Sequence, residues 1–386
     1  MGLRLETGIY LKPKDRNRLE AIHDFLAKRM TRAQTAAALD VSERTVSRLA
    51  GQVSQAGVVG VVHKNRERSP WNKLDPDVLE KARDLILTRY QNFNILHAHE
   101  FLVRDHQIKI SYSSLRRLCH RIHAVKRPKR RAKVRHYRPR HSSEGYLLQM
   151  DGSTHVWYGD EKKCLIAGID DATSDIPYGE FCDQEGLWPA LRVLRKTIEI
   201  KGIPWGVYVD LAGWFAGWDK NMQTQFNRVC NELGIRVIPA YSPQAKGRIE
   251  RAWGTLQDRL IAEFGLRNIQ TKKDANQYLN EVFLKETWRK KFTSVPDSEI
   301  NLYRPVQLHQ NLDKIFCLKY QRKVRNDHTV MYANERYEIT AKIPYSIARR
   351  LIEIRVDERG EVEGWLNERN LNLQPLRKSL GNRYAS

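Results

Sequence analysis

The sequence has few cysteines, and none of them stand at paired spacing. The 386 residues contain five, at positions 119, 164, 182, 230 and 317. A disulfide framework and a Cys-x-x-Cys zinc site both need closely spaced pairs, so we expect neither, and we expect reduced thiols, as in a cytosol. His97, His99, His120 and His123 also lack zinc-site spacing, and we interpret them as ordinary helix-surface histidines.

Long apolar runs are absent as well. No run approaches the roughly 20 residues that a membrane-spanning helix needs, and the amino terminus has no signal-peptide pattern. The sequence therefore favours a soluble, cytoplasmic protein without a membrane partner.

Acidic residues are scarce in the first part of the chain. The formal net charge is +22, and residues 1–145 contain 31 Lys and Arg against 14 Asp and Glu. Such a balance favours contacts with phosphate groups and a steep salt dependence of binding. We therefore expect double-stranded DNA as the partner.

The length predicts several domains, because single domains commonly run about 100 to 200 residues. We predict a multidomain α/β chain with six parts. They are a helix-turn-helix DNA-binding domain (1–66), a second helical, helix-turn-helix-like DNA-binding domain (72–123), a basic linker (124–143), an α/β catalytic core (144–266), a helical connector (267–320) and a small β-barrel (321–378).

The first domain reads as helix, tight turn, helix. Ala36, Leu39, Val41, Val46 and Leu49 supply apolar positions that would pack two helices, and Ser42 can cap the second. That second helix would present Arg44, Ser47 and Arg48 to the DNA major groove. A plain helical bundle is the alternative.

The second helical domain could read DNA too. Its last predicted helix, 111–123, carries Arg116 and Arg117, although a helical spacer with a solvated basic face fits the pattern nearly as well. Residues 126–140 then hold nine Lys and Arg, no acid and two prolines. Self-repulsion and proline keep such a segment extended, and we expect it to follow the DNA backbone through Lys126, Arg127, Lys129, Arg130, Arg131, Lys133 and Arg135.

The core has acids at three informative places. Apolar runs at 146–150 and 207–209 predict strands that end before Asp151 and Asp210, and Glu250 lies in a long predicted helix after the loop 241–247. The predicted order β-β-β-α-β-α-β-α resembles the ribonuclease-H-type fold. Asp219, in a Gly- and Trp-rich loop, is a weaker alternative to Asp210.

Carboxylates gathered in this way suit magnesium. Mg²⁺ prefers hard oxygen ligands and keeps water and phosphate oxygens as its other ligands. Two such ions roughly 4 Å apart can activate an attacking oxygen and stabilise a leaving one. We therefore expect two Mg²⁺ ions, with Mn²⁺ as a substitute, held by Asp151, Asp210 and Glu250.

Three segments together, 146–153, 206–210 and 242–260, resemble the integrase-type catalytic core of bacterial insertion-sequence transposases, with the group often labelled ISNCY as the nearest likeness. The resemblance implies catalysis by Asp151, Asp210 and Glu250. It also implies cleavage of DNA at the element's ends by water, joining of the freed 3′-hydroxyl to target DNA, a homo-oligomer on DNA, and a nucleoid-associated location.

The chain departs from that family at two places. Leu211-Ala212-Gly213 follows the second Asp where a basic residue and His are usual, and Trp253 stands where Asn is common. Lys246, Arg248 and Arg251 surround Glu250, and we expect them to contact DNA rather than to be plain exposed cations. A non-catalytic DNA-binding regulator with the transposase fold is the alternative function, and a ribonuclease or resolvase of the same fold is a third.

Overall fold

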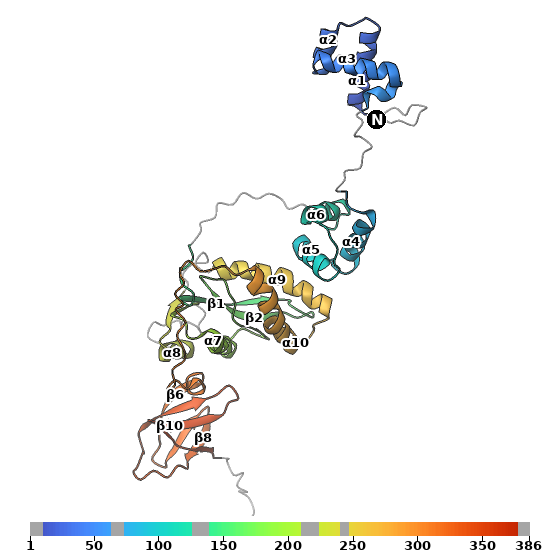
Figure 1. Ribbon diagram of the computed structural model, residues 1–386. Helices are drawn as coiled ribbons and strands as arrows, with labels where there is room; N and C mark the ends of the chain where they lie inside the picture. Colours follow the sequence, from blue (N-terminus) through green and yellow to red (C-terminus); the bar gives the residue numbers. More distant parts are fainter. Residues whose placement is uncertain (1–10, 63–72, 126–138, 210–223, 240–246, 377–386) are drawn as a thin grey trace, which may run out of the picture. The chain divides into compact units, whose positions relative to one another are not determined.

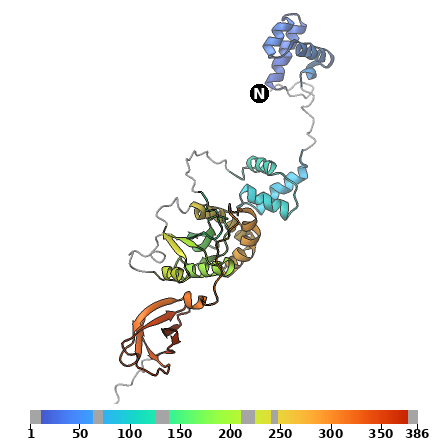
Figure 2. The same ribbon diagram turned by 60° about the vertical axis from the view of Figure 1, so that its left-hand side comes forward.

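The computed structural model describes residues 11–62, 73–125, 139–209, 224–239 and 247–376 (Figures 1 and 2). The chain forms two compact units, Met1–Leu79 and Glu80–Ser386, which we describe separately. None of the described helices is long and apolar enough to cross a membrane.

The first unit contains the predicted helix-turn-helix. Its helices are α1 (Pro13–Leu26), α2 (Arg32–Leu39), α3 (Glu43–Ala56) and the short 3₁₀ helix η1 (Gly57–Val61). Asp40 has a left-handed backbone (φ 51°), which gives the tight turn between α2 and α3, and the Ser42 hydroxyl accepts a hydrogen bond from the Thr45 N–H. The predicted cap is therefore confirmed.

All five predicted apolar positions of this unit lie in one hydrophobic cluster. Ala36, Val46 and Leu49 are buried, and Leu39 and Val41 pack partly buried against them. The helical pattern in the sequence was sufficient here, because the residues that pack together are close in the chain.

The boundary between the units falls within α4 (Pro76–Thr88), and the second unit continues with α5 (Ile95–Arg104) and α6 (Tyr112–Arg121). Phe93 packs edge to face with Tyr90 and Phe101, and Tyr90 and Phe101 are tilted against each other, at ring-centroid distances of 5.1 to 5.8 Å. Asn94 and Ser111 cap α5 and α6 by accepting hydrogen bonds from the backbone.

A five-stranded sheet follows, in the order β3-β2-β1-β4-β5. Its strands are β1 (Leu147–His155), β2 (Lys163–Asp170), β3 (Gly179–Cys182), β4 (Gly206–Val209) and β5 (Arg236–Pro239). The first three strands are antiparallel, and β4 pairs in parallel with both β1 and β5. With α7 (Leu187–Lys201), α8 (Gln225–Glu232) and α9 (Gly247–Arg267), this reproduces the predicted element order.

Each face of the sheet is covered by helices (Figure 1). On one face, Leu148 and Met150 of β1 join a core with α7 and α8. On the other, Leu165 and Ala167 of β2 pack on α9. That second face also meets α10 (Lys272–Gln277) and the π-helix η4 (Tyr278–Trp288), which continues into α11 (Arg289–Lys291).

The strand β1 is longer than predicted. The sequence indicated that it ends before Asp151, whereas it runs through this residue to His155. The polar residues 152–155 gave no apolar signal, but they pair with β2, from Gly152 opposite Ile166 to His155 opposite Lys163. The parallel ladder with β4 covers only Leu147 to Gln149, so Asp151 lies beyond it.

The predicted small β-barrel is wrong for the described residues. They form two open sheets, β11-β10-β9-β6 and β12-β8-β7, around one core. Asn372 (φ 48°) turns the chain between β11 in one sheet and β12 in the other, so a corner replaces the ladder that would close a barrel. The elements are α12 (Leu312–Ile315), β6 (Leu318–Lys323), β7 (Thr329–Tyr332), β8 (Glu335–Ile339), β9 (Leu351–Val356), β10 (Val362–Leu366), β11 (Arg369–Asn370) and β12 (Leu373–Pro375).

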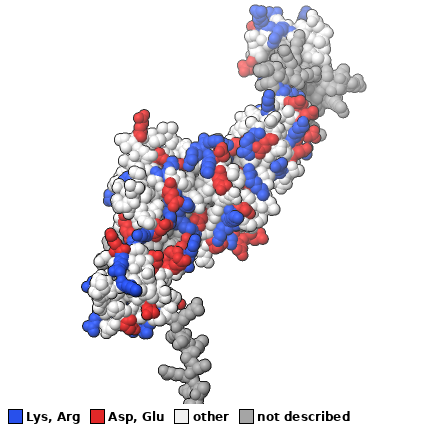
Figure 3. All heavy atoms as spheres, turned by 60° about the horizontal axis from the view of Figure 1, so that its bottom comes forward, with Lys and Arg blue, Asp and Glu red and all other residues white. Residues whose placement is uncertain are grey.

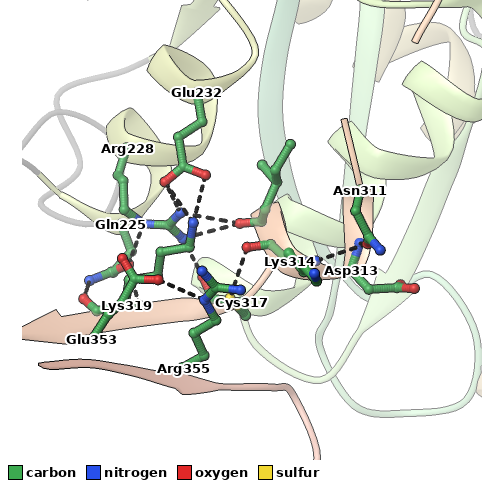
Figure 4. Close-up of polar contacts among 11 residues, drawn as sticks. Gln225, Arg228, Glu232, Asn311, Asp313, Lys314, Cys317, Lys319, Glu353 and Arg355 are labelled. Carbon is green, nitrogen blue, oxygen red and sulfur yellow. Dashed lines mark hydrogen bonds and ion pairs between the residues drawn. The ribbon is translucent and has the colours of Figure 1, made fainter. Parts of the chain in front are cut away.

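Polar contacts fasten these sheets to α8 (Figure 4). Gln225 bonds the backbone of Lys319 through both its amide nitrogen (2.8 Å) and its amide oxygen (3.1 Å). Arg228 donates to the carbonyl oxygens of Ile315 and Cys317 and to the Glu232 carboxylate. The carboxylate of Glu232 also pairs with Lys319 (2.8 Å).

Candidate functional site

Asp151 lies on the face of β1 that meets α9. Alternate residues of a strand share a face, and Gln149, Asp151 and Ser153 all have polar partners on this side. The indole Nε1–H of Trp253 donates to Asp151 Oδ2 at 3.0 Å, and Gln257 Nε2 donates to the Ser153 hydroxyl at 3.1 Å. A strand carboxylate is thus held from the helix that covers it.

Glu250 lies in the first turn of α9 and is exposed. Trp253 follows it by three residues, so both lie on neighbouring positions of one side of the helix. Ile249, Ala252 and Leu256 are buried and fix which side of α9 faces the sheet. A helix amino terminus also favours a negative charge.

The third predicted acid, Asp210, lies outside the described residues. It follows Val209, the last residue of β4, in the sequence. Among the described residues, no three His, Cys, Asp or Glu side chains gather closely enough to hold a metal ion. The described part of the candidate site therefore consists of Asp151, Glu250 and the groups around them.

Arg248 occupies a different place from the one expected. It was predicted to contact DNA, but it is only 7% exposed and its Nε donates to Asp171 Oδ1 at 2.7 Å. Asp171 is fully buried and also accepts from Gln149 Nε2 at 2.6 Å. Arg248, two residues before Glu250, thus points inward because a buried carboxylate accepts its hydrogen bond.

Arg251 is exposed on the first turn of α9. It lines a small hollow of about 140 Å³ together with Arg140, Thr255, Trp288 and Phe292. Lys246, the third cation predicted around Glu250, lies outside the described residues, as do Lys126, Arg127, Lys129, Arg130, Arg131, Lys133 and Arg135 of the basic linker.

The predicted DNA-reading residues of the helical parts are on the surface. Arg44, Ser47 and Arg48 are exposed on α3, opposite the buried Val46 and Leu49. Arg116 and Arg117 are exposed on α6, where Arg117 donates to the Ser114 hydroxyl at 3.3 Å. Both helices present their cations to solvent because their apolar residues face the opposite way.

A buried polar cluster between α5 and α9 was missed from the sequence. His97 is not a surface histidine: it is fully buried, and its Nε2 lies 2.9 Å from Glu263 Oε1. Burial opposes ionisation of Glu263, yet the hydrogen bonds from His97 and Tyr278 outweigh it and hold its pKa below the ordinary value of 4.5. Burial, with Glu263 beside it, raises the pKa of Tyr278.

A second contact joins the same two helices. Glu100 of α5 accepts from both terminal nitrogens of Arg259, at 2.7 and 3.0 Å, and pairs with Lys291 at 2.7 Å. Burial opposes ionisation of Glu100, but Arg259 and Lys291 hold its pKa below its usual range. The sequence shows only that these residues lie in predicted helices. It does not show which helix each of them contacts.

Comparison with known proteins gives several matches. The Homeodomain-like domain family matches residues 12–62. The y4bF protein of Sinorhizobium fredii, named as a transposase, is 29% identical over 369 residues, covering 94% of this chain and 80% of that protein. The transposase for insertion sequence IS1202 of Streptococcus pneumoniae is 30% identical over 346 residues, covering 76% of this chain and 74% of its own length.

Solved structures give weaker matches. The catalytic core domain of HTLV-2 integrase in complex with magnesium is 17% identical, with a TM-score of 0.29 over 36% of this chain and 89% of that one. The simian T-cell lymphotropic virus intasome in complex with PP2A regulatory subunit B56 gamma is 14% identical, with a TM-score of 0.33 over 76% of this chain and 95% of that one.

Proposed function

Because the chain belongs to the family of insertion-sequence transposases related to that of IS1202, we propose that it binds the terminal repeats of its element and catalyses metal-dependent 3′-end cleavage and strand transfer into target DNA. The observation that carries this proposal is the contact between β1 and α9. It brings the strand of Asp151 under the first helical turn, where Glu250 lies.

Asp151, Asp210 and Glu250 are the proposed catalytic residues and metal ligands. Asp151 lies on β1, and Glu250 lies on α9, the helix that packs on that face of the sheet. In the sequence, Asp210 directly follows β4, the strand beside β1 in the sheet. Carboxylate oxygens are the donors that Mg²⁺ prefers, so these residues fit that ion, and Mn²⁺ would substitute. Two bound ions would activate the attacking oxygen and stabilise the leaving one.

The protein's own groups have distinct parts in this scheme. Trp253 orients the Asp151 carboxylate by its N–H, and Arg251, exposed beside Glu250, is placed to meet a DNA phosphate. Water first attacks a phosphodiester at the element's end, which breaks the P–O3′ bond, frees a 3′-hydroxyl and leaves the phosphate on the 5′ end of the other fragment. The freed 3′-hydroxyl then attacks a target phosphodiester and displaces the 3′-oxygen of the target strand. Neither step needs a covalent enzyme intermediate.

DNA recognition is assigned to the helical parts. We propose that α3 lies in the major groove with Arg44, Ser47 and Arg48 toward the bases, and that Arg116 and Arg117 of α6 provide a second contact. The basic linker, residues 124–143, would follow the backbone between these readers and the core. The proposed domains comprise residues 1–66, 72–123, 124–143, 144–266, 267–320 and 321–378.

An oligomer is part of the proposal, because two element ends must be held together for paired joining. The alternative is a DNA-binding regulator that does not cut. The departures from the family at 211–213 and Trp253 are its support, although Trp253 contacts Asp151 in a way that helps to hold the carboxylate.

The test is cleavage of a duplex that carries the inverted repeat flanking the gene, by the unmodified protein and by Asp151→Asn, Asp210→Asn and Glu250→Gln. We expect Mg²⁺-dependent cleavage that is lost in each variant, while binding to the repeat is kept. Specific binding without cleavage by the unmodified protein would favour the regulator. Equal cleavage of an RNA·DNA hybrid or a four-way junction would favour a different nuclease of this fold.

A further inference from the structure

Asp171 joins three segments of the second unit through its buried carboxylate. Oδ1 accepts from Gln149 Nε2 (2.6 Å) in β1 and from Arg248 Nε (2.7 Å) in α9, and Oδ2 accepts from the His141 backbone N–H (2.9 Å). The carboxylate and Gln149 are fully buried, and the Arg248 side chain is 6% exposed. We call Gln149, Asp171 and Arg248 the buried triad.

The triad lies next to the proposed metal ligands on both elements. Gln149 precedes Asp151 by two residues in β1 and shares its face, and Arg248 precedes Glu250 by two residues in the first turn of α9. Further along α9, Trp253 donates a hydrogen bond to Asp151 itself, and Gln257 donates one to Ser153, two residues further along β1. The two acids are thus enclosed between fixed points.

The spacing of these points matches along both elements. From Gln149 to Ser153 the strand rises about 13 Å, and from Arg248 to Gln257 the helix rises about 13 Å as well. The helix can therefore run along the strand with all three contacts made at once. Each contact fixes the same register, and the register fixes how far Glu250 lies from Asp151.

Stability alone does not account for the triad. Removing two charges from water costs about as much as their attraction returns, so a buried ion pair is weak evidence for stabilisation. Among the described residues, the buried Gln149 Oε1 also has no hydrogen-bond partner, which adds a cost that an apolar side chain would avoid. Metal ligands, by contrast, need their positions fixed within a fraction of an ångström.

We propose that Gln149, Asp171 and Arg248 are positioning residues that set the distance between the Asp151 and Glu250 carboxylates and so determine divalent-metal affinity. This inference rests on the proposed function. Carboxylates that share a metal site repel each other before the ion arrives, and the first turn of α9 is held against this repulsion by Arg248. The loop that contains Asp171 also contacts Arg140 at the end of the basic linker. The Nη1 of Arg140 donates to the Ala172 carbonyl oxygen (3.0 Å) and to the Ser174 hydroxyl (2.7 Å).

The test measures Mn²⁺ binding to the full chain by the loss of the free-ion electron paramagnetic resonance signal, with thermal melting in parallel. Asp171→Leu combined with Arg248→Met should bind Mn²⁺ about ten-fold more weakly, as groups that orient metal ligands commonly do when lost. Its melting temperature should change no more than that of Arg259→Met. Arg259 is the matched control, since it is a buried, paired arginine of the same helix, 3% exposed, far from Glu250.

The conservative variant Arg248→Lys covers the case in which the double variant does not fold. It keeps the charge but shortens the reach, and it should weaken Mn²⁺ binding several-fold while Arg259→Lys does not. Equal Mn²⁺ affinity in the Arg248 and Arg259 variants would overturn the inference and leave the proposed function standing. Asp151→Asn separates the two: if it binds Mn²⁺ as well as the unmodified protein, the proposed metal site itself is wrong, and the inference falls with it.

Discussion

At the scale of single residues, the contact between Trp253 and Asp151 is the most informative. The sequence marked Trp253 only as a departure from a family pattern, because nothing local shows that an indole N–H will meet a strand residue 102 positions earlier in the chain. In the structure its ring is buried in the hydrophobic cluster to which Ile249 and Leu256 also belong, while its N–H donates to the carboxylate. One side chain thus both packs α9 and orients an acid.

Trp253→Phe separates these two roles. The phenyl ring keeps most of the packing, whereas the hydrogen bond to Asp151 is lost, so we expect strand transfer to fall about ten-fold with a small change in melting temperature. Trp157→Phe is the control, because the Trp157 N–H donates to a backbone carbonyl, that of Ser153, in the same core. Equal activity losses in both variants would show that Trp253 acts through packing alone.

Glu263 gives a prediction of pH dependence. Its pKa is lowered in the folded chain, so its contribution to stability is complete above the ordinary value of 4.5 and is lost as the pH falls through the lower, folded value. The gap in melting temperature between the unmodified chain and Glu263→Gln should therefore shrink below about pH 4.5.

The matched control for Glu263 is Glu286→Gln. Glu286 pairs with Lys290, but both side chains are more than 60% exposed, and exposed pairs contribute little. The melting temperature of the Glu286→Gln variant should equal that of the unmodified chain at every pH of the titration. A constant gap for Glu263→Gln from neutral to acid pH would refute the role assigned to the cluster of His97, Glu263 and Tyr278.

At the scale of elements, the sequence predicted most helices and strands but not their partners. The helix α7 shows what a local pattern can predict, since Leu191, Leu194 and Ile198 recur at helical spacing and are buried. The extension of β1 was missed because residues 152–155 are polar and are held by pairing with β2. The two-sheet arrangement at the carboxyl end was missed because it depends on ladders between strands that are not neighbours in the sequence, which no local pattern contains.

The helix α3 supports a prediction about DNA binding. Arg44→Ala and Arg48→Ala should each weaken binding to the terminal repeat by about 1 to 3 kcal/mol if the side chains contact bases. Neither should lower stability, because both residues are exposed. Arg16→Ala on α1, with a side chain 56% exposed, removes the same charge elsewhere. If all three variants weaken binding equally, α3 is not the reading helix.

The attachment of the carboxyl-terminal sheets to α8 depends on Arg228 (Figure 4). Arg228→Met leaves the carbonyl oxygens of Ile315 and Cys317 without their donor, and we expect a loss of about 2 kcal/mol in the free energy of unfolding by urea. Arg195→Met, which removes a more exposed arginine paired with Glu199 and Asp313, should cost less than about 1 kcal/mol. The reverse order would contradict this account of the junction.

At the scale of the whole molecule, the excess positive charge and the candidate catalytic acids lie in different parts of the chain. The positive excess lies mainly in residues 1–145. On the face drawn in Figure 3, Lys and Arg alternate with Asp and Glu over the described surface of the second unit. Composition therefore predicted a nucleic-acid partner, whereas the proposal of metal-dependent catalysis depends on Asp151, Asp210 and Glu250 and not on net charge. The docking of α5 on α9 through Glu100 and Glu263 lay beyond prediction, because buried ion pairs leave no pattern distinct from solvated ones.

We propose that Asp151, Asp210 and Glu250 catalyse the joining of DNA strands with a divalent metal. The most direct measurement is strand transfer of a duplex carrying the flanking inverted repeat, in Mg²⁺, by the unmodified protein and by Glu250→Gln. The account predicts joined product from the unmodified protein and none from the variant, with both bound to the repeat. Joined product from both proteins alike would contradict it.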